Sequence, residues 1–142
     1  MARVNSLSRN RKWKELSIVL VDDAEISPLN FKHLGRSGPT DVLSFCYEPF
    51  PGENSLFTGE IVVNVERAAN VCIKGSRKDN WDASRELALY IAHGCNHLLD
   101  EQDYDPAGRA RMRRRELRWL RNTDQDILQD LITDRSTKKK RR

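Results

Sequence analysis

Residues 81–98 read WDASRELALYIAHGCNHL, and this segment decides the fold that we predict. Its apolar residues recur at helical spacing, which predicts an amphipathic helix with Asp82 or Ser84 as the N-cap. One side of the helix is assigned to the core. That side carries Leu87, Ile91, Cys95 and Leu98.

Two of the three histidines of the chain, His93 and His97, stand four residues apart in this helix. That spacing places both imidazoles on one face, one turn apart, where they can bind the same metal ion. Asp103 follows the helix, and a turn would bring its carboxylate back as a third ligand; Asp100 or Asp105 could take that place instead. Three protein ligands leave a position for water, as in catalytic zinc sites. A histidine pair with nothing bound is the alternative.

Three segments ahead of this helix predict β-strands, because they are rich in aliphatic, β-branched and aromatic residues. They are residues 16–21 (LSIVLV), 42–47 (VLSFCY) and 60–65 (EIVVNV). Residues 48–58 contain two prolines and a glycine and predict a loop between the second and third strands.

One helix is predicted between the first and second strands, and the others follow the third strand. Ser27 and Pro28 can begin a short helix that ends at Gly35, with Ser27 as its N-cap. Further helical segments run over residues 66–72 and 107–133, the latter interrupted near residues 122–123. This mixture predicts an α+β fold: a single domain with a small mixed β-sheet packed against helices, in which the histidine-bearing helix is central.

Positive charge is concentrated toward the ends of the chain. The formal net charge is +4, and because the last five residues are all lysine or arginine, the remainder is nearly neutral. We predict a basic N-terminal arm over residues 1–15, a folded domain over residues 16–135 and a basic tail over residues 136–142. Such a tail can interact with nucleic-acid phosphates, although a solvated terminus is the simpler interpretation.

The composition of the 142 residues excludes several classes of protein. No apolar run approaches the roughly 18 residues that a membrane helix needs, and the N-terminus lacks the hydrophobic stretch of a signal peptide. Three cysteines without paired spacing argue against a disulfide framework. We therefore expect a soluble, cytoplasmic protein in a reducing compartment.

Several motifs, in the right order along the chain, resemble the YbeY family of endoribonucleases. Residues 40–45 (TDVLSF) match a signature of that family, and residues 59–63 (GEIVV) are similar to the GDIVI strand that follows it. Residues 93–99 (HGCNHLL) are similar to the family's metal motif, HGxLHLxGYDH. Met112 and Glu116 also stand where the family usually has them. Ordered motifs that agree are far more specific than any single one.

The resemblance covers roughly residues 16–120 and implies a function. It implies a zinc-dependent endoribonuclease that hydrolyses single-stranded RNA, with roles in maturing the 3′ end of 16S ribosomal RNA and in ribosome quality control. RNA, ribosomal RNA and the ribosome are the implied partners. The implied ligands of one zinc ion are His93, His97 and Asp103, with the aspartate in place of the family's third histidine; carboxylate oxygen is an acceptable zinc ligand.

Two departures from the family lie toward the N-terminus. A family arginine ahead of the TDVLSF motif would fall on Leu34, and Arg36, two residues further on, is a candidate catalytic residue after a local shift; an ordinary surface arginine is the alternative. The chain ahead of residue 16 is also too short and polar to supply the family's usual first strand and helix. We therefore expect a sheet edge that is absent or differently covered.

The seven arginines between Arg109 and Arg121 favour RNA binding, because guanidinium groups match the geometry of phosphates. Four of them can share one helix face. These candidate nucleic-acid-binding residues are Arg111, Arg114, Arg115 and Arg118. A solvated face that pairs with neighbouring acids is the alternative. Tyr104 and Trp119 could stack on bases or pack on the core.

Two classes of function remain open. A bound metal can activate water and stabilise a phosphoryl oxygen, which suits phosphodiester hydrolysis. Zinc peptidases of the His-Glu-x-x-His type have a general base at the position of Gly94, so this glycine counts against peptidase chemistry. The second interpretation is a non-catalytic RNA- or ribosome-binding relative that keeps the metal for its structure, because Leu34 and residues 100–102 depart from the family.

Overall fold

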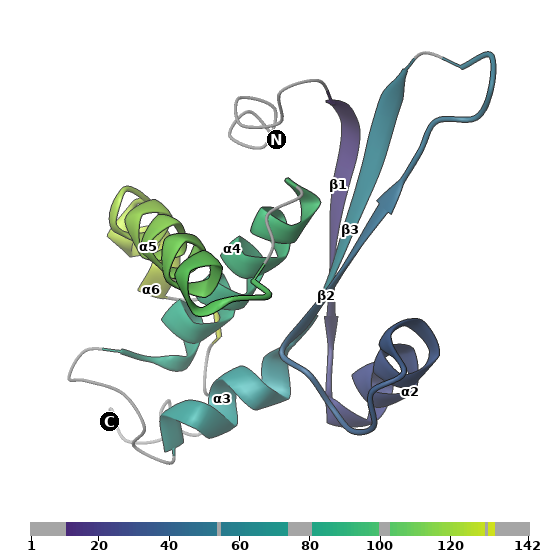
Figure 1. Cartoon of the computed structure of the whole chain (residues 1–142). Helices are drawn as coiled ribbons and strands as arrows, with labels where there is room; N and C mark the ends of the chain where they lie inside the picture. Colours follow the sequence, from purple (N-terminus) through teal and green to yellow (C-terminus); the bar gives the residue numbers. More distant parts are fainter. Residues whose placement is uncertain (1–10, 54, 74–80, 100–102, 130, 133–142) are drawn as a thin grey trace, which may run out of the picture.

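The computed structural model describes residues 11–53, 55–73, 81–99, 103–129 and 131–132, and Figure 1 shows how they are arranged. The elements in chain order are β1 (Lys12–Val21), α2 (Asp23–Leu34), β2 (Val42–Tyr47), β3 (Leu56–Asn64), α3 (Val65–Ile73), α4 (Ala83–Leu98), α5 (Pro106–Arg121) and α6 (Gln125–Gln129). The sheet has the order β1-β3-β2, with β1 parallel and β2 antiparallel to β3. The predicted α+β fold with a small mixed sheet is therefore confirmed.

The central strand β3 is covered on both faces. Ile61 and Val63 belong to the larger core cluster, on the side of α4, whereas Val62 packs with Ile26 of α2 and Leu43 of β2. Successive side chains of a strand point to opposite faces, so a strand covered on both sides needs an unbroken apolar run. Figure 1 shows α2 and α4 on opposite sides of the sheet.

The first strand begins earlier than predicted. β1 starts at Lys12 rather than at residue 16, and its Trp13 is 7% exposed and packs against Phe57 with 6.1 Å between ring centroids. Arg11 also donates to the backbone oxygen of Leu98 at 3.3 Å. Residues 12–15, which the sequence placed in the basic arm, are thus part of the sheet. Residues 1–10 and 136–142 lie outside the described residues.

The loop predicted over residues 48–58 is shorter in the structure, because the third strand also begins earlier than predicted. β3 begins at Leu56, because Leu56 and Phe57 pair with Lys12 and Trp13 at the start of β1. A single strand segment carries no local sign of a partner more than forty residues away. β2 has the predicted bounds, and β3 ends at Asn64, one residue before the predicted end.

Helix α2 begins at Asp23, four residues before the predicted N-cap Ser27. Asp22 is the N-cap: its Oδ1 accepts from the Glu25 backbone nitrogen at 2.8 Å, and Glu25 Oε2 accepts from the Asp22 nitrogen at 3.0 Å. This reciprocal capping box satisfies two helix-end donors, so the helix follows β1 directly. As predicted, Gly35 ends the helix, and its backbone is in the left-handed conformation.

Helix α4 is the central element, as predicted, because it contacts β2, β3, α3, α5 and α6. Asp82 is its N-cap, which decides between the two predicted caps. The predicted apolar side is confirmed: Leu87 and Leu98 are in the larger core cluster, and Ile91 and Cys95 pack against it. On another side, α4 packs against α5 and α6 through a second cluster of four buried residues, namely Leu89, Ala92, Leu120 and Leu128.

The helical segment predicted over residues 107–133 is two helices. α5 ends at Arg121 with Asn122 as its C-cap, and α6 is a short helix that follows. The predicted interruption near residues 122–123 is therefore confirmed. Among the residues that the structure describes, none of the helices combines the length and the apolar character needed to cross a membrane.

Candidate metal centre and adjoining cleft

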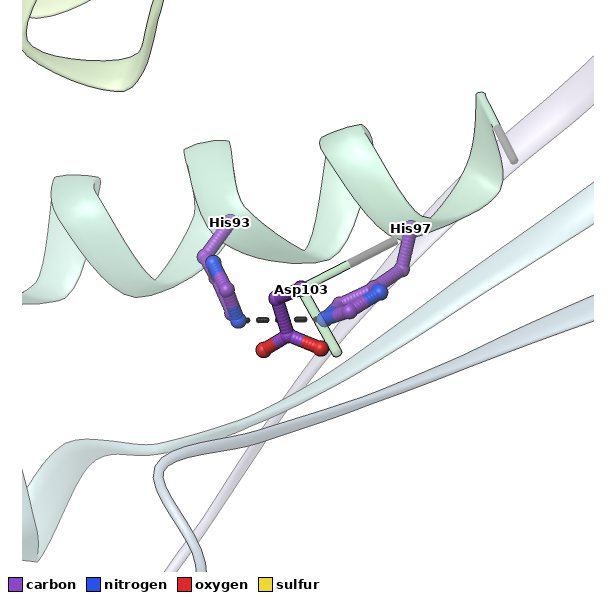
Figure 2. Close-up of side chains that lie close together, drawn as sticks. All are labelled: His93, His97 and Asp103. Atoms are coloured by element: carbon purple, nitrogen blue, oxygen red, sulfur yellow. Dashed lines mark hydrogen bonds between the residues drawn. The ribbon is translucent and has the colours of Figure 1, made fainter. Parts of the chain in front are cut away.

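The three residues predicted to share a metal ion lie together. Figure 2 shows His93 and His97 projecting from the same side of α4 toward Asp103, which comes from the segment after the helix. The two Nε2 atoms are 3.0 Å apart, and one ligand atom from each of the three residues lies within 4.8 Å of the others. Two imidazole nitrogens and a carboxylate oxygen form a group that could hold a metal ion.

The two alternative third ligands have different positions. Asp105 is the N-cap of α5, where its Oδ1 accepts from the Gly108 backbone nitrogen, and it is not part of the group. Asp100 lies outside the described residues. Among the described residues, Asp103 is the carboxylate that accompanies the two histidines.

A buried carboxylate orients His93. Its Nδ1 donates to Glu116 Oε1 at 2.7 Å, and Glu116, on α5, is only 2% exposed. Because Nδ1 is used in this bond, Nε2 faces His97 and is available to a metal ion. The hydrogen bond to Glu116 raises the pKa of His93 above its usual value, although burial of the ring acts in the opposite direction.

Asn96 extends this polar contact between α4 and α5. It is fully buried, and its Nδ2 donates to Glu116 Oε1 at 3.0 Å and to the Met112 backbone oxygen at 3.4 Å. Its Oδ1 accepts from Arg115 at 3.3 Å. A buried amide needs such partners, and they give a physical reason for an asparagine where the metal motif has leucine.

Gly94 allows α4 to approach the sheet closely. A Cβ at this position would lie 2.8 Å from Ile61 Cγ2 and 3.1 Å from Val42 Cγ2. Ser44 of β2 donates from its hydroxyl to the Gly94 backbone oxygen at 3.0 Å. Position 94 therefore faces the sheet and has no room for the glutamate of a zinc peptidase.

The histidine cluster borders a cleft of about 430 Å³. His93 and Asp103 line it, together with the apolar side chains of Val71, Leu89 and Met112. Three arginines also line the cleft: Arg67 of α3 and Arg109 and Arg113 of α5. The further acidic lining comes from Asp41, Glu86 and Glu116.

A model of the family described as Endoribonuclease YbeY matches residues 2–124. The chain belongs to this family. The match begins fourteen residues earlier than the resemblance found in the motifs. Two of the motifs that resemble the family are in contact in the structure, because the hydroxyl of Ser44 in TDVLSF donates to the backbone oxygen of Gly94 in the metal motif.

Curated relatives carry the same name, Endoribonuclease YbeY. The relative from Anaeromyxobacter sp. (strain Fw109-5) is 37% identical over 75% of this chain, and the chain spans 53% of that protein. The relative from Syntrophus aciditrophicus is 35% identical over 80% of this chain and 72% of its own length. The relative from Syntrophomonas wolfei is 36% identical over 84% of this chain and 78% of its own length. The chain therefore spans between about half and four fifths of these relatives.

The candidate catalytic arginine, Arg36, does not line the cleft. It is exposed in the segment between α2 and β2. Leu34, at the position of the family arginine, ends α2 and is 55% exposed.

The predicted RNA-binding arginines also lie outside the cleft lining. Arg111, Arg114 and Arg118 are exposed, whereas Arg115 is half-buried and bonded to Asn96. RNA binding by this face stays a prediction. Trp119 packs against the second core cluster, and Tyr104 is 86% exposed.

Sequence reasoning missed the arginines that do line the cleft. Arg109 and Arg113 are spaced by four residues and share a helix face with Glu116, so this spacing, counted from Glu116, could have found them. Arg67 has no comparable signal, because its place depends on how α3 packs against α4.

A buried acid and a phenol were also missed. Glu86 is 1% exposed and accepts from Trp81 Nε1 at 2.6 Å. Tyr90 stands one turn later in α4, and burial, followed by the neighbouring Glu86 carboxylate, raises its pKa. Both residues line the cleft, but neither belongs to the group of metal-ligating side chains.

Proposed function

We propose that this chain is a metal-dependent endoribonuclease that hydrolyses phosphodiester bonds in single-stranded RNA. The observation that carries the proposal is the convergence of His93, His97 and Asp103 beside a cleft lined by arginines. Membership of the family supports the reaction class, since the relatives are named endoribonucleases.

We propose one zinc ion per chain at this group. Two imidazole nitrogens and one carboxylate oxygen suit zinc and leave a position open for water. When bound, zinc would supply a Lewis acid that makes water a stronger nucleophile and stabilises charge on a phosphoryl oxygen. Glu116 would hold the His93 ring so that Nε2 faces the ion, and Asp103 would add a negative charge that partly neutralises it.

The cellular substrate that we propose is ribosomal RNA. The family resemblance implies maturation of the 3′ end of 16S ribosomal RNA and ribosome quality control, with the ribosome as partner and the cytoplasm as location. A peptide substrate is disfavoured by Gly94, because the sheet occupies the space that a general base would need there.

Metal-dependent cleavage of a labelled single-stranded RNA tests this function. We expect zinc-loaded protein to cleave it, chelation to stop cleavage, and added zinc to restore it. His97→Ala should abolish cleavage while the protein still folds. His33→Ala is the matched control, because His33 is exposed on α2 and lies outside the metal group. Its ring meets the Phe45 ring edge-to-face, with 4.8 Å between the ring centroids.

Metal analysis of the same preparations tests the ligand set. We expect about one zinc per wild-type chain and a clear loss in His97→Ala and Asp103→Ala. Full occupancy in Asp103→Ala would show that a different residue is the third ligand. Asp105→Ala serves as the comparison, because Asp105 caps α5.

A non-catalytic RNA- or ribosome-binding protein is the second candidate function. The observation that favours it is the position of Arg36 and Leu34, neither of which lines the cleft. Tight binding of single-stranded RNA, with no cleavage above background at any metal concentration, would support this function and exclude the first.

A further inference from the structure

Three arginines in the cleft have no role in the proposed metal site. Arg67 comes from α3, and Arg109 and Arg113 come from consecutive turns of α5. They line the same cleft as His93 and Asp103, so all three stand beside the group that would hold the metal. Guanidinium groups bind phosphates through paired hydrogen bonds, and they retain their charge at any physiological pH.

The acidic groups of the cleft are engaged elsewhere. Glu116 accepts from His93 and Asn96, and Glu86 accepts from Trp81. Asp41 Oδ1 accepts from the Val42 backbone nitrogen at 2.9 Å and from the Thr40 hydroxyl at 3.2 Å. Each of these carboxylates therefore already accepts hydrogen bonds from donors of the protein.

The guanidinium groups differ from these acids. Arg109 donates to the Asp103 backbone oxygen at 3.0 Å, which holds its head group next to the metal group. The backbone nitrogen of Arg67 donates to Asn64 Oδ1 at 3.0 Å, but within the described residues the guanidinium groups of Arg67 and Arg113 donate no hydrogen bond and form no ion pair with a carboxylate. Two cationic side chains in one cleft thus keep their hydrogen-bonding capacity for a ligand.

We propose that Arg67 and Arg113, with Arg109 beside Asp103, form a subsite that binds the RNA backbone phosphates next to the bond held at the metal group. This inference rests on the proposed function and specifies how that site holds its substrate. It also places RNA against the cleft face of α5, and not against the face that carries Arg111 and Arg118.

Binding of a fluorescein-labelled single-stranded oligoribonucleotide tests the subsite directly. The full chain is used in EDTA, which stops metal-dependent cleavage, and anisotropy is measured across a range of salt concentrations. We expect Arg67→Gln/Arg113→Gln to weaken binding by about tenfold or more and to reduce the salt slope by about 1.4, because each phosphate contact in a single strand contributes about 0.7.

Charge-matched variants separate the subsite from net charge. Lys32→Gln/Arg121→Gln removes two positive charges from exposed positions outside the cleft, and we expect a much smaller effect. Arg67→Lys/Arg113→Lys keeps the charge but loses the paired geometry, so its affinity should lie in between. Thermal unfolding of every variant shows whether it is folded.

Cleavage kinetics supply an independent readout with zinc-loaded protein. We expect Arg67→Gln/Arg113→Gln to raise KM by about tenfold and to leave kcat within about threefold, because the lost contact holds the substrate before and during reaction. A drop in kcat at unchanged KM would contradict a binding subsite.

Three results of the binding measurements would also overturn the inference. Equal weakening by the cleft variant and by Lys32→Gln/Arg121→Gln would show that only net charge matters. A larger loss in Arg111→Gln/Arg118→Gln would place RNA on the opposite face of α5. Absence of RNA binding by the wild type would overturn both the subsite and the proposed function. If the wild type binds RNA with the expected variant pattern but never cleaves it, the subsite stands and the proposed nuclease fails.

Discussion

The two sides of α4 meet their neighbours differently, because a buried polar contact is present on the side of α5. Toward the sheet, Leu87 and Leu98 are buried among apolar side chains, and Gly94 lets the backbones approach closely. Toward α5, the helix presents His93 and Asn96 to the buried Glu116. On the α5 side the helix also packs Leu89 and Ala92 into the second apolar cluster, so the polar contact that orients the metal-binding ring lies beside apolar packing.

This difference indicates where changes should have separate effects. Burial of apolar groups stabilises the fold whatever the orientation of those groups to one another. A buried polar group, in contrast, is tolerated only when it has a hydrogen-bond partner in a defined geometry. Changes on the sheet side should thus alter stability, and changes in the polar contact with Glu116 should alter metal affinity.

The largest expected effect concerns the thiol on the sheet side. Burial raises the pKa of Cys95 to about 11, so almost none of it is thiolate at pH 8, whereas Cys46 is exposed on β2. Since the thiolate is the nucleophile, we expect alkylation of Cys95 by iodoacetamide to be at least about a hundredfold slower than that of Cys46. Raising the pH toward 11 should accelerate the Cys95 reaction.

Peptide mass spectrometry after timed labelling measures both rates in one sample. In urea the two thiols should react at similar rates, which serves as the control. Comparable rates in the folded protein at pH 8 would mean that the sheet side of α4 is open to solvent, and the contrast between the two sides would be lost.

Gly94→Ala should cause the next largest effect, a loss of about 1–3 kcal/mol in the free energy of unfolding. The added Cβ would lie 2.8 Å from Ile61 Cγ2, so α4 or the sheet must move. Helix propensity alone predicts the opposite sign, a gain of about 1 kcal/mol. Urea unfolding measures the difference.

Ala110→Gly, at an exposed position of α5, is the control for this test. It should lower the free energy of unfolding by about 1 kcal/mol, because glycine has a lower helix propensity than alanine. Stabilisation by Gly94→Ala would show that α4 does not approach the sheet as closely as described.

On the other side of α4, Glu116→Gln should lower metal affinity by about tenfold or more. Glutamine has nearly the same shape but lacks the charge that holds His93 Nδ1 at 2.7 Å. Competition with a chelator of known affinity measures the change. Glu15→Gln, at an exposed position of β1, is the control. Unchanged affinity in Glu116→Gln would remove the proposed link between α5 and the metal group.

The sequence predicted best what depends on neighbouring residues. The bounds and cap of α4 follow from its local period and from Asp82, and the helix spacing of His93 and His97 places both rings on one face. The start of β1 was missed because Lys12 and Trp13 are ordered by pairing with the start of β3, which no local pattern reveals.

The arginines of α5 show the limit of periodicity in the candidate site. Helical spacing separates a face with Arg111 and Arg118 from a face with Arg109 and Arg113, but it does not tell which face meets the site. Which face lines the site depends on the packing of α5 against α4. Glu116 identifies that face only once its hydrogen bond to His93 is known.

The smallest expected effect comes from a polar contact between the sheet and α4. Ser44 belongs to the TDVLSF motif, and its hydroxyl donates to the Gly94 backbone oxygen at 3.0 Å. Ser44→Ala should cost about 1 kcal/mol of unfolding free energy, since it removes one neutral hydrogen bond in a partly buried place. Metal affinity should not change, because the bond ends on the backbone and leaves the His93 ring in place.

Ser17→Ala is the matched comparison, because Ser17 donates to the Gly59 oxygen over a longer distance of 3.4 Å within the sheet and should contribute less. If Ser44→Ala instead weakened metal binding as strongly as Glu116→Gln, the contact between the motif and α4 would help to position the histidines. The sheet side would then take part in the metal site, and the conclusion that it affects stability but not metal affinity would be wrong.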